Sequence, residues 1–158
     1  MNDLPYRRCV GIALFNAKGE VWVGQRSDMT EPAWQMPQGG IDKGEDPETA
    51  AFRELDEEIG TANAEVLAET RDWLAYDLPP DLVGKVWKGR YRGQKQMWFA
   101  LRFLGDDSEI DPQAVDHPEF DTWRWVSLDE LPDLAVSFKR DIYAAVAREF
   151  RAFSGAPD

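Results

Sequence analysis

The stretch from residue 39 to residue 61 reads GGIDKGEDPETAAFRELDEEIGT, and it decides much of the predicted fold. Asp46 is suited to cap a helix, because its carboxylate can accept a hydrogen bond from a backbone N–H of the first turn. Pro47 suits the first helical position, where its missing N–H costs little. Gly60 is suited to end the helix, since glycine readily adopts the left-handed conformation found there. The sequence therefore predicts a helix from about Pro47 to Ile59.

This predicted helix has two chemically different faces. One face is apolar at a spacing of four residues, which is typical of a side that packs against a core. Its members are Ala51, Leu55 and Ile59, and Phe52 widens the stripe. The other face carries Glu54, Glu57 and Glu58, because residues three and four positions apart share one side of a helix. Like charges at this spacing repel each other by a few tenths of a kcal/mol per pair.

Two interpretations of the acidic face are open from the helix alone: a solvated surface, or a site for a divalent cation. Carboxylate oxygens suit Mg²⁺ or Mn²⁺, and these ions usually share ligands with substrate phosphates. The segment before the helix contains Gly39, Gly40 and Gly44, which permit backbone conformations that other residues avoid. A glycine-rich loop that leads into a carboxylate-bearing helix favours a metal–phosphate site.

The spacing of these residues resembles the Nudix box, a motif that spans 23 residues of the chain. The matching positions are Gly39, Glu45, Arg53, Glu54, Leu55, Glu57, Glu58 and Gly60. Only Thr61 departs from the pattern, because an aliphatic residue is usual there. The resemblance implies a Nudix-type α/β/α sandwich around a mixed β-sheet, with a loop–helix–loop catalytic motif and divalent cations as cofactors.

Size and composition are those of one domain, and we expect residues 1–158 to form a single Nudix hydrolase domain. The sequence shows no apolar run long enough to cross a bilayer and no evident signal peptide. The single cysteine, Cys9, rules out an internal disulfide and is expected in a strand-lined core. These observations predict a cytoplasmic protein without a membrane partner; a monomer is plausible, but the sequence leaves the oligomeric state open.

The net charge of −12 argues against tight, nonspecific binding to nucleic acid. The charge is unevenly distributed, however, because the segment from Leu82 to Gly105 has no acidic residue. Its cations are Lys85, Lys88, Arg90, Arg92, Lys95 and Arg102, and aromatic residues lie between them. Two interpretations remain: an ordinary strand pair with exposed cations, or a local positive surface for a polyphosphate or the 5′ end of RNA.

The remaining elements also follow from periodicity. Strands are expected at Cys9–Phe15, Val21–Gln25, Gln96–Leu104 and Asp121–Ser127, strand-forming residues at Glu65–Tyr76, a loop at Ser27–Ala33 and a helical turn or loop at Leu128–Leu134. An apolar stripe from Phe138 to Phe153 predicts a C-terminal helix. Strands mixed with two main helices indicate an α/β/α sandwich.

Segments outside the box resemble one branch of the family, the bacterial RNA pyrophosphohydrolases and the related diadenosine polyphosphate hydrolases. They include Thr70–Tyr76, Gly93–Phe99, Pro118–Val126 and Val136–Asp141, and the resemblance covers nearly the whole chain. It implies Mg²⁺-dependent hydrolysis, with Mn²⁺ as a possible substitute, of a polyphosphate attached to a nucleoside: the 5′-triphosphate of RNA or a diadenosine polyphosphate. The alternatives are another substrate (ADP-ribose, a nucleotide sugar, an oxidised nucleoside triphosphate) or a non-catalytic nucleotide-binding module.

The resemblance also implies roles for individual residues. The metals would be held by Glu54, Glu57 and Glu58, together with Glu119 and the carbonyl of Gln38 or Gly39. Arg53 would orient a box glutamate, most simply Glu57, which lies four residues further along the helix. Glu45 would support the loop. Arg26 and Phe138 would contact the nucleobase, and Tyr76, Lys95 and Lys139 the phosphates, with Gln38 also near the substrate. The sequence does not decide whether Glu54, Glu57 or Glu119 takes the proton from water.

Several of these residues have a plainer interpretation. Phe138 could belong to the core, Lys139 could be a solvated charge, and Glu119 could be a surface acid. Trp123 and Trp125 are expected to pack rather than to stack on a base. The only histidine, His117, is expected to be exposed and non-catalytic.

Overall fold

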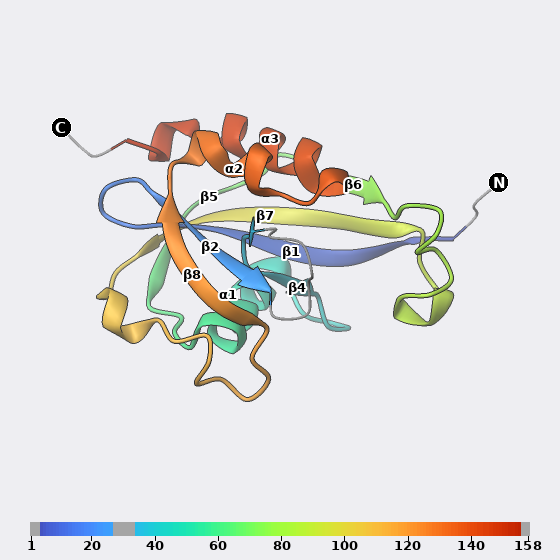
Figure 1. Cartoon of the computed structure of the whole chain (residues 1–158), viewed down its shortest axis with the longest axis horizontal. Helices are drawn as coiled ribbons and strands as arrows, with labels where there is room; N and C mark the ends of the chain where they lie inside the picture. Colours follow the sequence, from blue (N-terminus) through green and yellow to red (C-terminus); the bar gives the residue numbers. More distant parts are fainter. Residues whose placement is uncertain (1–3, 27–33, 156–158) are drawn as a thin grey trace.

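The computed structural model of the chain describes residues 4–26 and 34–155, so the predicted loop at 27–33 lies outside the described residues (Figure 1). An eight-stranded sheet forms the centre of the molecule. Its strands are β1 (Tyr6–Phe15), β2 (Val21–Arg26), β3 (Trp34–Gln35), β4 (Gln38–Gly40), β5 (Ala64–Glu69), β6 (Leu74–Asp77), β7 (Gly93–Phe103) and β8 (Phe120–Val126).

The sheet is mixed, as the sequence predicts. Its main path runs β3-β2-β1-β7-β5, while β4 pairs with β1, β6 with β7 and β8 with β2. The long central pair β1 and β7 is parallel, and the other pairs are antiparallel. Parallel neighbours need a long crossover, and the chain between β1 and β7 supplies it with α1 and several shorter strands.

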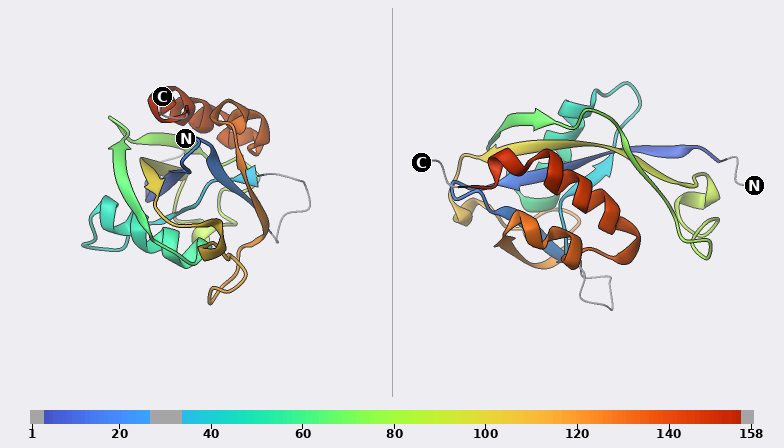
Figure 2. Two further views of the ribbon diagram at one scale, coloured as in Figure 1. Left: turned by 90° about the vertical axis from the view of Figure 1, so that its left-hand side faces the viewer. Right: turned by 90° about the horizontal axis from the view of Figure 1, so that it is seen from above.

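Helices cover both faces of this sheet, which confirms the predicted α/β/α sandwich (Figures 1 and 2). Helix α1 (Pro47–Ile59) lies on one face; α2 (Leu131–Leu134) and α3 (Arg140–Glu149) lie on the other. Each face has its own apolar core: one joins the sheet to α3 through residues such as Trp98 and Tyr143. The other joins it to α1 through residues such as Phe99 and Leu55. None of the helices in the described ranges is long and apolar enough to span a membrane.

Helix α1 has the predicted bounds and the predicted caps. The carboxylate of Asp46 accepts a hydrogen bond from the Thr49 N–H at 3.2 Å. Gly60 has a φ of 87°, and its N–H donates to the carbonyl oxygen of Asp56. Ala51, Leu55 and Ile59 are fully buried, so the apolar stripe packs on the sheet. On the glutamate face, Glu58 is buried as well.

The predicted elements within the described ranges are correct in type, but several bounds differ. Strand β1 begins at Tyr6 rather than Cys9, and β7 runs from Gly93 to Phe103 rather than from Gln96 to Leu104.

The strand-forming segment at 65–76 is divided into β5 and β6, because the chain bends at Arg71 and Asp72. Just before the bend, Thr70 is held against β7: its N–H donates to the carbonyl oxygen of Trp98, and its hydroxyl accepts the Trp98 N–H. The C-terminal apolar stripe is longer than α3, because its ends lie in 3₁₀ turns at Ser137–Lys139 and Arg151–Phe153. The short strands β3 and β4 escaped prediction, since Met36 and Pro37 separate them after only a few residues.

Candidate active site

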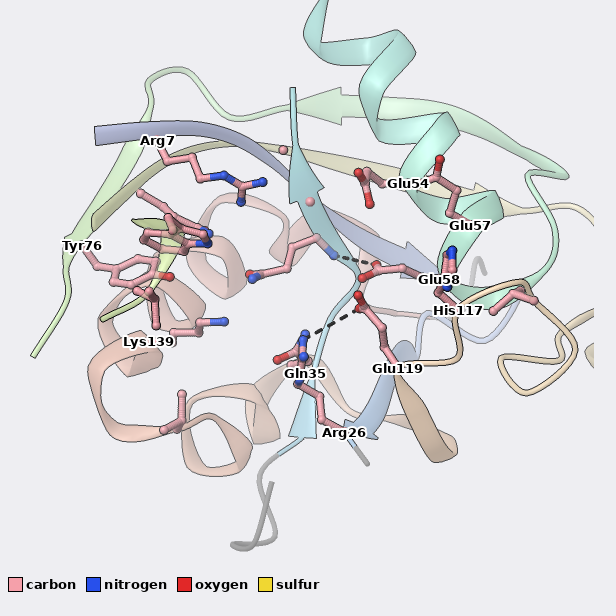
Figure 3. Close-up of a pocket in the computed structure, with 18 of the residues that line it drawn as sticks. Arg7, Arg26, Gln35, Glu54, Glu57, Glu58, Tyr76, His117, Glu119 and Lys139 are labelled. Atoms are coloured by element: carbon pink, nitrogen blue, oxygen red, sulfur yellow. Dashed lines mark hydrogen bonds and ion pairs between the residues drawn. The ribbon is translucent and has the colours of Figure 1, made fainter. Parts of the chain in front are cut away.

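A cleft of about 950 Å³ lies beside the acidic face of α1 (Figure 3). It brings together nearly all the residues expected at the site: Arg26, Gln38, Gly39, Glu54, Glu57, Glu58, Tyr76, Glu119, Phe138 and Lys139. The cleft has two chemically different ends. Carboxylates from α1 and from the start of β8 gather at one end, and cationic and aromatic side chains, among them Arg7, Tyr76 and Lys139, gather at the other.

Arg53 organises the carboxylate end from just outside the cleft. Its guanidinium donates two hydrogen bonds to Glu45, at 2.9 and 2.8 Å, and one to the carbonyl oxygen of Gly40 at 2.9 Å. It also bonds to Glu54 at 2.8 Å and to Glu57 at 3.2 Å. The two bonds from Arg53, and then one from the Asp42 N–H, lower the pKa of Glu45 to about 2. The contact expected between Arg53 and Glu57 is therefore present, and the loop-supporting place expected for Glu45 is also observed.

Glu54 and Gly39 lie so close together that a side chain at position 39 would displace the Glu54 carboxylate. A methyl group on Gly39 would lie 2.0 Å from Cδ of Glu54 and 2.1 Å from its Oε2, far inside van der Waals contact. The side chain of Glu54 is 14% exposed. Its pKa is raised, above all by burial, although Arg53 acts in the opposite direction. The glycine that opens the box motif thus gives the Glu54 carboxylate room beside the backbone of β4.

Glu58 is the buried acid of the site. It is 5% exposed, and its carboxylate accepts the backbone N–H of Gln38 at 2.9 Å. Burial raises its pKa well above the usual range, and neighbouring Glu119 and then Glu54 add to the effect. Glu119 lies within hydrogen-bond reach of Glu58, although the two residues are far apart in the sequence. Sharing of a proton between close carboxylates, or of a cation, relieves their repulsion.

The donor set fits a hard divalent cation. Glu54, Glu57, Glu58 and Glu119 offer carboxylate oxygens, which Mg²⁺ and Mn²⁺ prefer, at the wall of an open cleft. Burial is the main cause of the raised pKa of Glu58, and the charges of Glu119 and Glu54 add to it; such an ion would relieve this repulsion. Within residues 4–26 and 34–155, no three acidic, histidine or cysteine side chains converge tightly enough to hold an ion in the present geometry.

The opposite end of the cleft is aromatic and positive. The rings of Tyr76 and Phe138 lie 5.5 Å apart, and the ammonium of Lys139 lies 6.0 Å from the Tyr76 ring. Lys139 is only 9% exposed. Burial, followed by the charge of Arg26, lowers its pKa to about 8. Lys139 is thus a buried cation rather than a solvated one, and Phe138 lies at the cleft outside both apolar cores.

Two further residues of the basic end were missed as site residues. Arg7, on β1, and Trp87, in the loop before β7, both line the cleft. The Arg7 guanidinium lies 5.5 Å from the centre of the Trp87 ring, and its Nη2 would touch a methyl group on Gly40 at 2.5 Å. The acid-free segment at 82–105 contains Trp87 and could have marked it as a candidate site residue. No such feature marked Arg7: side-chain alternation places it on the same side of β1 as Cys9, but the sequence does not show which side faces the cleft.

A third group of residues connects the two ends. Arg26 and Glu119 form an ion pair of 3.8 Å, and Gln35 lies beside them (Figure 3). Gln35 is 8% exposed, and its Nε2 has no hydrogen-bond partner among the described residues. Glu119 is therefore part of the cleft wall and not a separate surface acid.

Lys95 is not brought to the cleft. Its neighbours in β7, Gln94 and Gln96, share one side of the strand, where their side chains are hydrogen-bonded to each other at 2.7 Å. Side chains alternate along a strand, so Lys95 faces the opposite side. Its ammonium lies 5.3 Å from the Trp73 ring, and Arg8 lies 5.3 Å from the same ring.

The remaining expectations concern packing and exposure. Trp123 and Trp125 pack against the core beneath α1, and Trp123 stacks on Trp22 at 6.2 Å. His117 is exposed, as expected, at the rim of the cleft. Cys9 is fully buried, also as expected, and burial raises the pKa of its thiol to about 11.

Comparison with known proteins agrees with this fold. The chain matches the NUDIX domain over residues 5–146, which is most of its length. The chain therefore belongs to the Nudix family, whose hydrolases generally use divalent metal ions.

Within the family, the chain is similar at high identity to proteins named RNA pyrophosphohydrolase. The RNA pyrophosphohydrolase of Rhodospirillum rubrum is 59% identical over 151 residues, which cover 96% of this chain and 90% of that protein. The RNA pyrophosphohydrolase of Roseobacter denitrificans is 60% identical over 151 residues, with 94% of each chain covered. Among solved structures, an Ap4A hydrolase of C. elegans superposes with a TM-score of 0.67 at 20% identity, covering 93% of this chain and 96% of that one. At that identity the likeness shows the fold alone.

Proposed function

We propose that this protein is an RNA pyrophosphohydrolase, which hydrolyses the 5′-triphosphate end of RNA to a 5′-monophosphate and releases pyrophosphate. The observation that carries the proposal is the two-ended cleft, in which four carboxylates face a group of cations and aromatic rings. Such a cleft is suited to a polyphosphate at one end and a nucleoside at the other. The two RNA pyrophosphohydrolases at 59% and 60% identity support this choice of substrate.

In this proposal the carboxylate end performs the chemistry. Glu54, Glu57, Glu58 and Glu119 hold divalent cations, with Mg²⁺ as the natural ion and Mn²⁺ as a substitute. The ions would supply charge neutralisation at the phosphate oxygens and activation of water. Arg53 keeps Glu54 and Glu57 in place through its hydrogen bonds, and one of Glu54, Glu57 and Glu119 accepts the proton of the attacking water.

The other end holds the substrate. Phe138 and Arg26 bind a nucleobase, since a flat ring and a planar guanidinium offer stacking surfaces. We assign Tyr76 to the nucleobase as well, rather than to the phosphates as expected from the resemblance, because its ring lies 5.5 Å from that of Phe138. Lys139 and Arg7 contact phosphate oxygens, because a buried ammonium and a guanidinium beside the carboxylates offset the charge of the polyphosphate. Lys95 faces away from the cleft, and we assign it no contact with the reacting phosphates.

Hydrolysis of dinucleoside polyphosphates is the second candidate, because these substrates also carry a nucleoside on a polyphosphate. The resemblance of several segments to diadenosine polyphosphate hydrolases favours it over nucleotide sugars or ADP-ribose. We further propose that residues 1–158 act as one domain in the cytoplasm, where the buried single thiol of Cys9 would stay reduced.

A comparison of rates tests the proposal. The purified protein is incubated with 5′-triphosphorylated RNA, diadenosine tetraphosphate and ADP-ribose, each with Mg²⁺ and with Mn²⁺, and kcat/KM is measured for each. We expect the RNA to be the best substrate, with pyrophosphate and 5′-monophosphorylated RNA as products. A clear preference for ADP-ribose would refute the proposal, and binding without turnover would support a non-catalytic module instead.

A further inference from the structure

Trp87 lies in a loop that is firmly closed at its base. The Leu78 N–H donates to the carbonyl oxygen of Arg92 at 2.8 Å, and the Arg92 N–H donates to that of Pro5 at 3.0 Å. The side chain of Arg92 also pairs with Asp77 at 2.8 Å. A loop whose ends are held together and whose interior is ordered by its own turns can present a side chain at a defined place.

The backbone around Trp87 is in a conformation that side chains rarely adopt. Trp87 has a φ of 50° and Lys88 a φ of 57°, and they are the non-glycine residues of positive φ in the described part of the chain. Left-handed conformations are unfavourable for residues with a Cβ atom, so two in succession need support from their surroundings. The Trp87 ring contacts that of Tyr91 edge-on, with the ring centroids 6.2 Å apart.

This geometry places the Trp87 ring in the wall of the cleft, next to Arg7 at 5.5 Å. The Tyr76–Phe138 pair forms a separate aromatic surface in the same cleft. A mononucleotide has one base and can stack on one such surface. An RNA end has a base on each nucleotide and can use both.

The loop also has the charge that a longer RNA requires. Lys85, Lys88 and Arg90 are exposed, and across residues 4–26 and 34–155 no acidic side chain forms an ion pair with any of them. Exposed cations beside a stacking ring are the combination that binds single-stranded nucleic acid. The protein as a whole has a net charge of −12, so the positive charge of this loop is opposite in sign to that of the whole chain.

We propose that Trp87 is a stacking platform for a second nucleobase, so that the cleft takes the first two nucleotides of an RNA 5′ end rather than a single nucleoside triphosphate. One base stacks on the Tyr76–Phe138 surface and the other on Trp87. The phosphodiester that follows passes the exposed cations of the loop. The inference rests on the proposed function. It adds that the site distinguishes a dinucleotide end from a mononucleotide.

The test compares a dinucleotide with a mononucleotide. For the wild-type protein and for Trp87→Ala, kcat/KM is measured with 5′-triphosphorylated ApG and with ATP. Loss of one base-stacking contact should lower kcat/KM for the dinucleotide by about tenfold and leave the value for ATP nearly unchanged. Equal losses on both substrates, or no loss on either, would overturn the inference.

Two further variants separate stacking from loop structure. Trp87→Phe keeps a flat ring and should retain most of the dinucleotide preference, whereas Trp87→Leu keeps apolar bulk without a ring and should lose it. If Trp87→Leu preferred the dinucleotide as strongly as wild type does, base stacking on Trp87 would be contradicted. This outcome can be observed even if Trp87→Ala does not fold. Trp73→Ala is the matched control, because that ring also contacts two cations, Arg8 and Lys95, but lies outside the cleft lining. It should leave the ratio of the two substrates unchanged.

A binding measurement keeps this inference apart from the proposed function. Calorimetric dissociation constants are measured for 5′-monophosphorylated ApG and for AMP, which need no hydrolysis. Wild-type protein should favour the dinucleotide, and Trp87→Ala should lose that preference. If wild-type protein bound the dinucleotide this way but released no pyrophosphate from its triphosphate, the proposed function would fail while the Trp87 assignment stood. If the protein hydrolysed the RNA end but Trp87→Ala changed neither the kcat/KM ratio nor the ratio of dissociation constants between dinucleotide and mononucleotide, the Trp87 assignment would fail while the proposed function stood.

Discussion

The guanidinium of Arg53 binds both carboxylate oxygens of Glu45, at 2.9 and 2.8 Å, and so fastens the glycine-rich loop to helix α1. Paired hydrogen bonds of this kind fix direction as well as distance. The same guanidinium also reaches Glu54 and Glu57. The position of two cleft carboxylates therefore depends on an ion pair that lies outside the cleft.

Replacement of Glu45 should make stability less sensitive to acid. The pKa of Glu45 is lowered from 4.5 to about 2 in the folded protein, first by its hydrogen bonds to Arg53. A lowered pKa contributes stability that is present above pH 4.5 and is lost as the pH falls toward 2. Glu45→Gln should therefore unfold at a lower temperature than wild type at pH 7, with the gap closing below pH 4.5. Thermal unfolding from pH 3 to pH 7 measures this, and a constant gap would contradict it.

Substitution of Gly39 should damage catalysis more than folding. An alanine Cβ would lie 2.0 Å from Cδ of Glu54, so the carboxylate would have to move. Displacement of a catalytic group by about 1 Å can cost about 100-fold in rate, and we expect that loss in kcat for Gly39→Ala. Gly155→Ala is the matched control, since nothing lies within 4 Å of its added methyl group. Normal activity in Gly39→Ala would show that the Glu54 position is unimportant.

Removal of one charge from the acidic face should abolish turnover. Glu57 is 57% exposed and lines the cleft, so Glu57→Gln changes charge without creating a cavity. We expect hydrolysis to fall by at least about 100-fold, with an unchanged melting temperature. Glu48→Gln, an exposed substitution on the same helix that lies outside the cleft lining, should retain activity. Full activity of Glu57→Gln at saturating Mg²⁺ would exclude Glu57 as a metal ligand.

A chelator should likewise abolish wild-type activity, and added Mg²⁺ should restore it.

Substrate binding should weaken as the pH rises through about 8. Lys139 has its pKa lowered to about 8, mainly by burial, so it is charged below that pH and neutral above it. A neutral amine attracts phosphate less, and KM should therefore rise above pH 8. Lys139→Met should show an increase in KM of about tenfold at pH 7, the value of one hydrogen bond to a charged group. Lys139→Arg stays charged and should lack the rise near pH 8; a persistent rise in that variant would assign it to another group.

The sequence by itself determined the local elements and the motif. The bounds of α1 followed from Asp46, Pro47 and Gly60, because capping and backbone preferences act over a few residues. Its two faces followed from the helical period. The family and the α/β/α fold class were likewise predictable, since spaced motif residues and strand and helix periodicity are properties of the chain alone.

Only the tertiary structure decided which distant side chains meet. Glu119 lies beside Glu58, and Trp87 lies beside Arg7, because sheet register and loop closure bring together residues that are far apart in the sequence. The tertiary structure also places the Lys95 side chain outside the cleft. Alternation along β7 places Lys95 and the neighbouring glutamines on opposite sides, and only packing against the two helical layers determines which side becomes the cleft.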